Sequence, residues 1–261
     1  MRSLLATSRR IVIKVGSSTI THPNGHLHLG RMEGLVRQLS DLHAEGRELV
    51  LVTSGAVGAG IGRLGLSERP SDTAAKQALA AVGQGVLMQR YEALFGEYGC
   101  NVGQVLLTRQ DFDSPPRSKS AAATMALLLS WRVIPVVNEN DTVTSEEIRV
   151  GDNDTLSARV AALIRADALV LLSDVEGFYP ADPRTHAGLE PLARVSLRDD
   201  LDNAAGGAGS GSGTGGMVTK VKAARICAAA GIKMVLAHGG RPGVLREILA
   251  GEPVGTLFEG D

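Results

Sequence analysis

The chain has 261 residues, 44% of them hydrophobic, so it can bury a sizeable core as one large domain or two small ones. Its 27 lysines and arginines are balanced by 28 aspartates and glutamates, giving a formal net charge of −1. This balance argues against a disordered tail or a polyanion-coating protein, and an aromatic content of only 3% argues against nucleic-acid binding.

Glycine is unusually frequent, with 32 residues, or about 12% of the chain against a usual share of ~7%. A collagen-like chain is excluded because no three-residue period is present. Excess glycine beside an Ala, Val and Leu interior favours a parallel α/β protein with several tight loops.

Short β-branched runs alternate with segments of helical periodicity, beginning with a strand at 9–15 that ends at Gly16. Further strands are predicted at 48–53, 101–107, 133–137, 168–172 and 232–237. Helices are predicted at 30–45, 71–98, 118–130, 152–164, 217–230 and 243–249. Repeated strand–helix units require right-handed crossovers. We therefore predict a three-layer αβα sandwich with a mainly parallel central sheet.

The two cysteines, Cys100 and Cys227, lie far apart in apolar surroundings and are interpreted as reduced, buried side chains. The first ten residues hold only a three-residue apolar run, too short for a signal peptide, and no stretch reaches the ~18 apolar residues of a membrane span. We expect a cytoplasmic protein without a membrane segment.

Ligands of open α/β sheets collect at the carboxyl ends of strands, and four such ends carry unusual residues. They are 14–18 (Lys-Val-Gly-Ser-Ser), 53–56 (Thr-Ser-Gly-Ala), 138–141 (Asn-Glu-Asn-Asp) and 173–174 (Ser-Asp).

The first two of these ends are typical of anion sites. Gly16 would let backbone amides approach a phosphate while Lys14 supplies a positive charge, although an edge lysine that reaches solvent is an equal alternative. Ser54 and Gly55 precede further glycines and a helix N-terminus, an arrangement that also suits an anion. The alternative is an ordinary tight turn.

Short polar side chains gather at 138–141 and again at 151–154 (Gly-Asp-Asn-Asp). A calcium loop is excluded because carboxylates do not alternate over twelve residues around a central glycine. Solvated turns are the alternative, but each cluster adjoins an apolar segment that must be buried, which favours a functional role.

The glycine-rich segment 204–216 contains a formal G-x-G-x-x-G, yet polar residues precede it and no acidic residue follows about twenty positions on, which disfavours a dinucleotide site. A flexible linker is one alternative. Because the segment leads into a helix whose first turn carries Lys220, we interpret it as a phosphate-covering loop. His26 and His28 have no third zinc ligand nearby, and Ser54 lacks a nucleophile elbow.

Seven ordered motifs resemble those of the glutamate 5-kinases of the amino acid kinase superfamily, and the resemblance covers nearly the whole chain from about Arg9. The motifs lie at 14–18, 52–56, 80–85, 137–141, 150–154, 181–184 and 213–220.

This resemblance implies transfer of the ATP γ-phosphoryl group to the side-chain carboxylate of L-glutamate, the first step of proline biosynthesis, with Mg²⁺ held largely by ATP oxygens and water. It implies that Lys14 and Lys220 flank the phosphoryl group, that Gly16 allows backbone approach, and that Asp154 holds both lysines. It assigns glutamate binding to Ser54, Asp141 and Asn153. Nucleotide binding is assigned to Lys14, Gly16, Ser173, Asp174, Thr214, Gly215, Gly216, Met217, Val218, Thr219 and Lys220, and no residue is assigned as a metal ligand.

The resemblance further implies proline as a feedback inhibitor and a homo-oligomer, either a dimer or a tetramer. We expect a single amino acid kinase domain over residues 1–261, without the RNA-associated PUA domain that many members carry. Two departures are a serine at 173, where threonine is more usual, and the sequence Ser-Lys-Ser-Ala-Ala at 118–122, where an aromatic-x-Asn-Ala-Arg run is common.

Three alternatives stay open at this point. A non-catalytic amino-acid sensor on the same scaffold would not need Lys14, Lys220 and Asp154, and an oxidoreductase using 211–216 is more remote. N-acetylglutamate kinase is the nearest alternative within the superfamily, although the motifs at 138–141 and 151–154 favour free glutamate.

Overall fold

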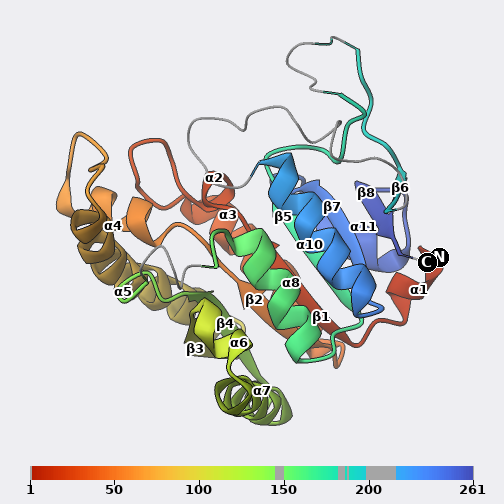
Figure 1. Ribbon diagram of the computed structural model, residues 1–261, viewed down its shortest axis with the longest axis horizontal. Coiled ribbons are helices and arrows are strands. Elements are labelled where there is room, and N and C mark those ends of the chain that lie inside the picture. Colours follow the sequence, from red (N-terminus) through yellow and green to blue (C-terminus); the bar gives the residue numbers. More distant parts are fainter. Residues whose placement is uncertain (1, 145–149, 182–185, 187, 198–215, 261) are drawn as a thin grey trace.

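The structure is a computed structural model, which describes residues 2–144, 150–181, 186, 188–197 and 216–260 (Figure 1). These residues form one sheet of eight strands in the order β3-β4-β2-β1-β5-β7-β8-β6. The strands are β1 Arg10–Val15, β2 Glu48–Val52, β3 Asn101–Leu107, β4 Val133–Glu139, β5 Ala168–Ser173, β6 Arg194–Ser196, β7 Lys233–His238 and β8 Thr256–Glu259. Every neighbouring pair is parallel except β7 and β8.

Helices connect these strands and cover the sheet. They are α1 Ser3–Ala6, α2 Ser17–Ile20, α3 Leu29–Ala44, α4 Ala56–Leu64, α5 Thr73–Glu97, α6 Arg109–Asp113, α7 Pro115–Ser130, α8 Asn153–Leu163, α10 Met217–Ala229 and α11 Val244–Ala250. None of the helices within the described ranges is long and apolar enough to cross a membrane.

The alternating side chains of the central strand show that both faces of the sheet are buried. Ile11, Ile13 and Val15 pack into a core with residues of α3, α5 and α11. Val12, pointing the other way, joins a second core with residues of α7, α8 and α10. Figure 1 shows α8 and α10 side by side across that second face. The predicted three-layer sandwich with a mainly parallel sheet is confirmed.

Helix α4 was not predicted, because glycines at 58, 60 and 62 lower its intrinsic helix propensity. The structure shows what compensates. A Cβ on Gly60 would lie 2.1 Å from the carbonyl oxygen of Leu79, and one on Gly83 would lie 1.7 Å from that of Ala56. The missing side chains therefore let α4 and α5 pack backbone against backbone. This contact fixes the start of α4 directly after the Ser54–Gly55 turn.

Candidate active site

The carboxyl ends of four adjacent parallel strands meet at one edge of the sheet. Strands β4, β2, β1 and β5 are neighbours in that order, so the loops that follow them lie next to one another. Lys14 comes from β1, Ser54 follows β2, Asp141 follows β4, and Ser173 ends β5. The fold thus brings together all four strand ends selected from the sequence.

Lys14, Asp154 and Lys220 form a buried ionic cluster. The Lys14 Nζ lies 2.7 Å from Asp154 Oδ1, and the Lys220 Nζ lies 3.2 Å from Asp154 Oδ2. Thr219 Oγ1 donates to the same Oδ2 at 2.8 Å. Lys14 points to the α8 side of the sheet because it shares that face with Val12, while Asp154 and Lys220 lie in the first turns of the packed helices α8 and α10.

The carboxylate at the centre of this cluster is strongly acidic. Burial alone would raise the pKa of Asp154, which is 1% exposed. The charges of Lys14 and Lys220, with hydrogen bonds from Lys14 and Thr219, outweigh burial and lower this pKa to about 2. Asp154 is therefore ionised at neutral pH, and with both lysines protonated the three side chains carry a net charge of +1. Such a cluster suits an anionic ligand.

Gly16 provides space next to this cluster rather than a donor of its own. Its N–H donates to the carbonyl oxygen of Leu172 at 3.2 Å, which departs from the expectation that backbone amides here would face a phosphate. A Cβ at this position would lie 3.6 Å from Lys14 Nζ and 3.8 Å from Ser18 Oγ. Because Gly16 has no side chain, a ligand can approach Lys14 Nζ through space that a side chain at position 16 would partly fill.

The predicted nucleotide-binding residues that the structure describes border the same edge. Ser173 is buried at the end of β5, next to β1, and its Oγ donates to Asp174 Oδ1 at 3.1 Å. Gly216 precedes α10, and the exposed Val218 lies in the first turn of that helix. Met217 and Thr219 share this turn. Thr214, Gly215 and the motif residues 182–184 lie outside the described residues.

A second polar network surrounds Asn153, the residue before Asp154. Asn153 Nδ2 lies within donating distance of the Thr53 carbonyl oxygen at 2.9 Å, Ser54 Oγ at 2.8 Å and Asn138 Oδ1 at 3.1 Å. Asn138 in turn donates from Nδ2 to Gln84 Oε1 at 3.0 Å. Two of the predicted glutamate-binding residues, Ser54 and Asn153, are therefore in direct contact one residue away from the ionic cluster.

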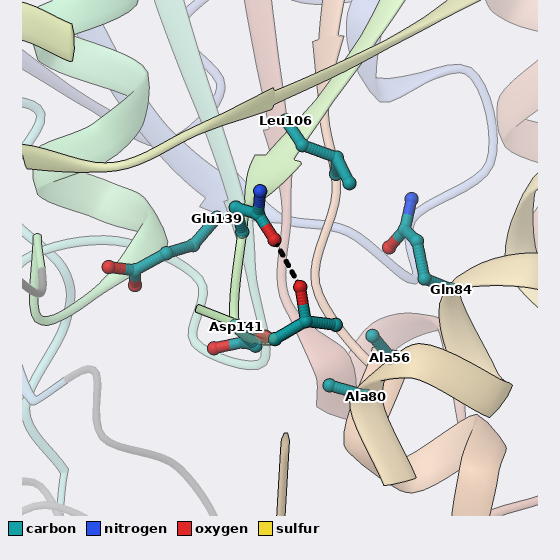
Figure 2. A pocket seen from close by; sticks show the side chains of 8 residues that line it. Ala56, Ala80, Gln84, Leu106, Glu139 and Asp141 are labelled. Atoms are coloured by element: carbon teal, nitrogen blue, oxygen red, sulfur yellow. Dashed lines mark hydrogen bonds between the residues drawn. The ribbon is translucent and has the colours of Figure 1, made fainter. Parts of the chain in front are cut away.

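The third predicted glutamate-binding residue, Asp141, lines a pocket between the loop after β4 and helices α4 and α5. Figure 2 shows Glu139 and Asp141 on one side of this pocket, with Gln84, Ala56 and Ala80 on the other. Leu106, Asn140 and Thr142 complete the lining, and the Thr142 hydroxyl donates to Asn140 Oδ1 at 2.6 Å. One end of the pocket is thus acidic, which suits a cationic group on a ligand.

Glu139 and Gln84 lie in the segments 138–141 and 80–85 selected from the sequence, but neither residue was given a role of its own there. The Glu139 carboxylate accepts from the backbone N–H of Val150 at 2.6 Å, which joins the loop after β4 to the segment leading into α8. Gln84 lies at helical spacing among the buried Ala80, Gly83 and Leu87 of α5. A polar residue at a core position of a helix is the signal that would have identified it.

Comparisons with known proteins show the family to which the chain belongs. The family model described as "Amino acid kinase family" matches residues 9–238. The chain belongs to the amino acid kinase family. It is 72% identical over 258 residues to the glutamate 5-kinase of Symbiobacterium thermophilum, covering 99% of this chain and 98% of that protein. The glutamate 5-kinase of Clostridium tetani is 51% identical, with 98% of this chain and 97% of that protein covered.

The fold has a counterpart among solved structures. The UMP kinase of Bacillus anthracis superposes with a TM-score of 0.67 at 14% identity and covers 97% of each chain. At this identity the likeness concerns the amino acid kinase fold alone.

Proposed function

We propose that this chain is a glutamate 5-kinase, which transfers the γ-phosphoryl group of ATP to the side-chain carboxylate of L-glutamate and so carries out the first step of proline biosynthesis. The observation that carries this assignment is the 72% identity to a glutamate 5-kinase over nearly the full length of both chains. The buried Lys14–Asp154–Lys220 cluster supplies the matching chemistry, because phosphoryl transfer depends on positioning and charge stabilisation.

The acceptor explains why the reaction needs no general base. A side-chain carboxylate with a pKa of ~4.3 is already ionised at neutral pH, so no proton has to be removed before it attacks. Lys14 and Lys220 stabilise the negative charge that spreads over the transferring group, and Asp154 holds the two ammonium groups in place. The open space at Gly16 admits a phosphate to Lys14, and Ser173, Asp174, Gly216, Met217, Val218 and Thr219 bind the nucleotide, together with Thr214 and Gly215.

Mg²⁺ fits this arrangement as an ion carried by the nucleotide. Within the part of the chain that the structure describes, no three His, Cys, Asp or Glu side chains gather as a metal site. Magnesium commonly keeps several waters and substrate phosphate ligands, and when bound it neutralises phosphate charge. We therefore assign no protein residue as a metal ligand.

The acceptor subsite is assigned from charge. Asp141 offsets the α-ammonium group of glutamate at the acidic end of the pocket, while Ser54 and Asn153 bind the acceptor nearer the ionic cluster. An acetylated nitrogen would carry no charge, so this assignment favours free glutamate over N-acetylglutamate. A coupled assay of ADP release with each acceptor tests the proposal. ADP release that depends on glutamate supports it, and a preference for N-acetylglutamate, or binding of glutamate without turnover, refutes it.

Feedback inhibition is proposed for the same subsite. Proline shares the α-carboxylate and a cationic α-nitrogen with glutamate, so Ser54, Asp141 and Asn153 bind either ligand and the two exclude each other. Inhibition by millimolar proline should weaken as glutamate rises. No effect of proline at sub-saturating glutamate would contradict competition, and purely non-competitive inhibition would indicate a separate site.

The organisation of the protein is proposed as well. The single sheet from β1 to β8 supports one amino acid kinase domain. We propose that it works as a dimer or tetramer in the cytoplasm, which light scattering of the purified protein and cell fractionation would test.

A further inference from the structure

Gln84 is a buried glutamine in a helix face that otherwise packs apolar and small residues. It lies on α5 directly after Gly83, and only 8% of its surface is exposed. The absence of a side chain at Gly83 brings this part of α5 against the Ala56 carbonyl, two residues beyond Ser54. Gln84 is therefore held close to the glutamate subsite by the packing of α4 on α5.

The hydrogen bonds around Asn138 fix the orientation of the Gln84 amide. The backbone N–H of Glu139 can only donate, and it does so to Asn138 Oδ1 at 2.9 Å. Asn138 must then present its Nδ2 to Gln84, whose Oε1 accepts at 3.0 Å. A flip of either amide would place two donors or two acceptors against each other.

The same reasoning extends to the residues that bind glutamate. Asn138 Oδ1 also accepts from Asn153 Nδ2, and this nitrogen donates to Ser54 Oγ. Because Ser54 Oγ accepts in that bond, its own hydroxyl proton is directed elsewhere and can be donated to a carboxylate oxygen. Asn138 thus connects the Gln84 amide to the amide of Asn153 and, through Asn153, to the donor direction of Ser54.

The Gln84 amide satisfies one buried polar group, Asn138 Nδ2, but its own nitrogen is not satisfied by any described residue. Among the described residues the buried Gln84 Nε2 has no hydrogen-bond partner, and burial of an unpaired amide donor opposes folding. An unbranched apolar side chain of the same length would remove this unpaired donor, but it would also take away the acceptor of the buried Asn138 Nδ2.

We propose that Gln84 is a positioning residue for the glutamate subsite, acting through Asn138 to fix the amide of Asn153 and the donor direction of Ser54. The inference rests on the proposed kinase function and adds to it a residue that lines the pocket opposite Asp141 and acts through its hydrogen bond with Asn138.

The test compares Gln84→Met with Gln89→Met, the same substitution five residues further along α5 at an exposed position. Methionine keeps the length of the side chain but removes the acceptor for Asn138. The kcat/KM for glutamate should fall ~10-fold in Gln84→Met, about the effect of one buried hydrogen bond, with the KM for ATP within ~2-fold of wild type. Gln89→Met should match wild type. Thermal unfolding shows which variants are folded. If Gln84→Met does not fold, Gln84→Leu is used in its place.

A double-mutant cycle separates positioning from a general structural role. If Gln84 acts through Asn153, Gln84→Met should lower kcat/KM for glutamate less than ~2-fold when Asn153→Ala is already present. If Gln84→Met lowers kcat/KM for glutamate equally with and without Asn153→Ala, or does not lower it in the single variant, the inference is overturned. The proposed function still holds in either case, provided that the wild-type protein is active. Wild type without glutamate-dependent ADP release would instead refute the proposed function.

Discussion

Replacement of Asp154 by asparagine keeps the shape of the side chain but removes the negative charge between Lys14 and Lys220. In the native protein this carboxylate lies 2.7 Å from one ammonium group and 3.2 Å from the other. The two lysine side chains are only 10% and 6% exposed, so water compensates little for the lost charge. The variant should therefore hold two buried ammonium groups that repel each other and no longer share a fixed position.

The expected magnitudes follow from this burial. Breaking a buried ion pair by removing one partner typically costs ~3–5 kcal/mol of folding free energy. Loss of one preorganised electrostatic group typically lowers kcat by ~10²–10³, which corresponds to ~2.7–4 kcal/mol of transition-state stabilisation. We expect Asp154→Asn to show both effects, with a smaller change in the KM for glutamate.

Urea unfolding and the coupled ADP assay measure the two effects, and the chain offers a matched control. Asp113 also bridges two cations, with Arg109 at 3.0 Å and Arg159 at 2.9 Å, but its side chain is 50% exposed. Asp113→Asn should cost less than ~1 kcal/mol and leave kcat unchanged, because exposed ion pairs contribute little. A kcat for Asp154→Asn within ~3-fold of wild type would refute the role assigned to the cluster.

Other substitutions test separate parts of the site. Lys14→Ala and Lys220→Ala should each lower kcat ~10²–10³ in the ADP assay, and near-native turnover of both would contradict charge stabilisation. Asp141→Asn should raise the KM for glutamate far more than that for ATP, whereas equal changes in steady-state kinetics would indicate a structural role. Gly83→Ala places a methyl group 1.7 Å from a carbonyl oxygen and should lower the melting temperature in calorimetry, unlike Gly85→Ala, which meets no atom within 4 Å. Because folding lowers the pKa of Asp154 from 3.8 to about 2, its ionisation stabilises the protein above pH ~4 and this contribution disappears as the pH falls toward 2. Unfolding free energies over that window should therefore fall ~2 kcal/mol more in wild type than in Asp154→Asn, and parallel curves would contradict the shifted pKa.

Most of the sheet could be predicted because buried parallel strands have a local signature. The run at Arg10–Val15 is rich in Ile and Val and is followed by a glycine, and its partner at Glu48–Val52 is a similar short apolar run of Leu and Val. The short strands β6 and β8 were missed, since three or four residues give too little periodicity. Helix α4 was missed for a different reason, because its glycines allow close contacts, such as that of Gly60 with Leu79 of α5 and that of Gly62 with Gly25, which no local pattern reveals.

The site residues could be selected one by one, but their partnerships depend on the fold. Lys14 and Asp154 are 140 positions apart, and only the packing of α8 on β1 brings their charged atoms to 2.7 Å. Likewise, the family resemblance assigned Asn153 to glutamate binding, but it did not indicate that the amide nitrogen of Asn153 donates to Ser54 and Asn138. Residue type and spacing identify candidates, whereas orientation comes from tertiary hydrogen bonds.

The arrangement of charge also bears on which acceptor is used. In the proposed site, the end assigned to phosphoryl transfer carries the net positive cluster of Lys14, Asp154 and Lys220, and the end assigned to the ammonium group carries Glu139 and Asp141. Free glutamate has the complementary order, with an anionic side chain at one end and an ammonium group at the other. An N-acetylated acceptor would bring a neutral amide to that acidic end and would lack the charge complementarity that we propose for free glutamate.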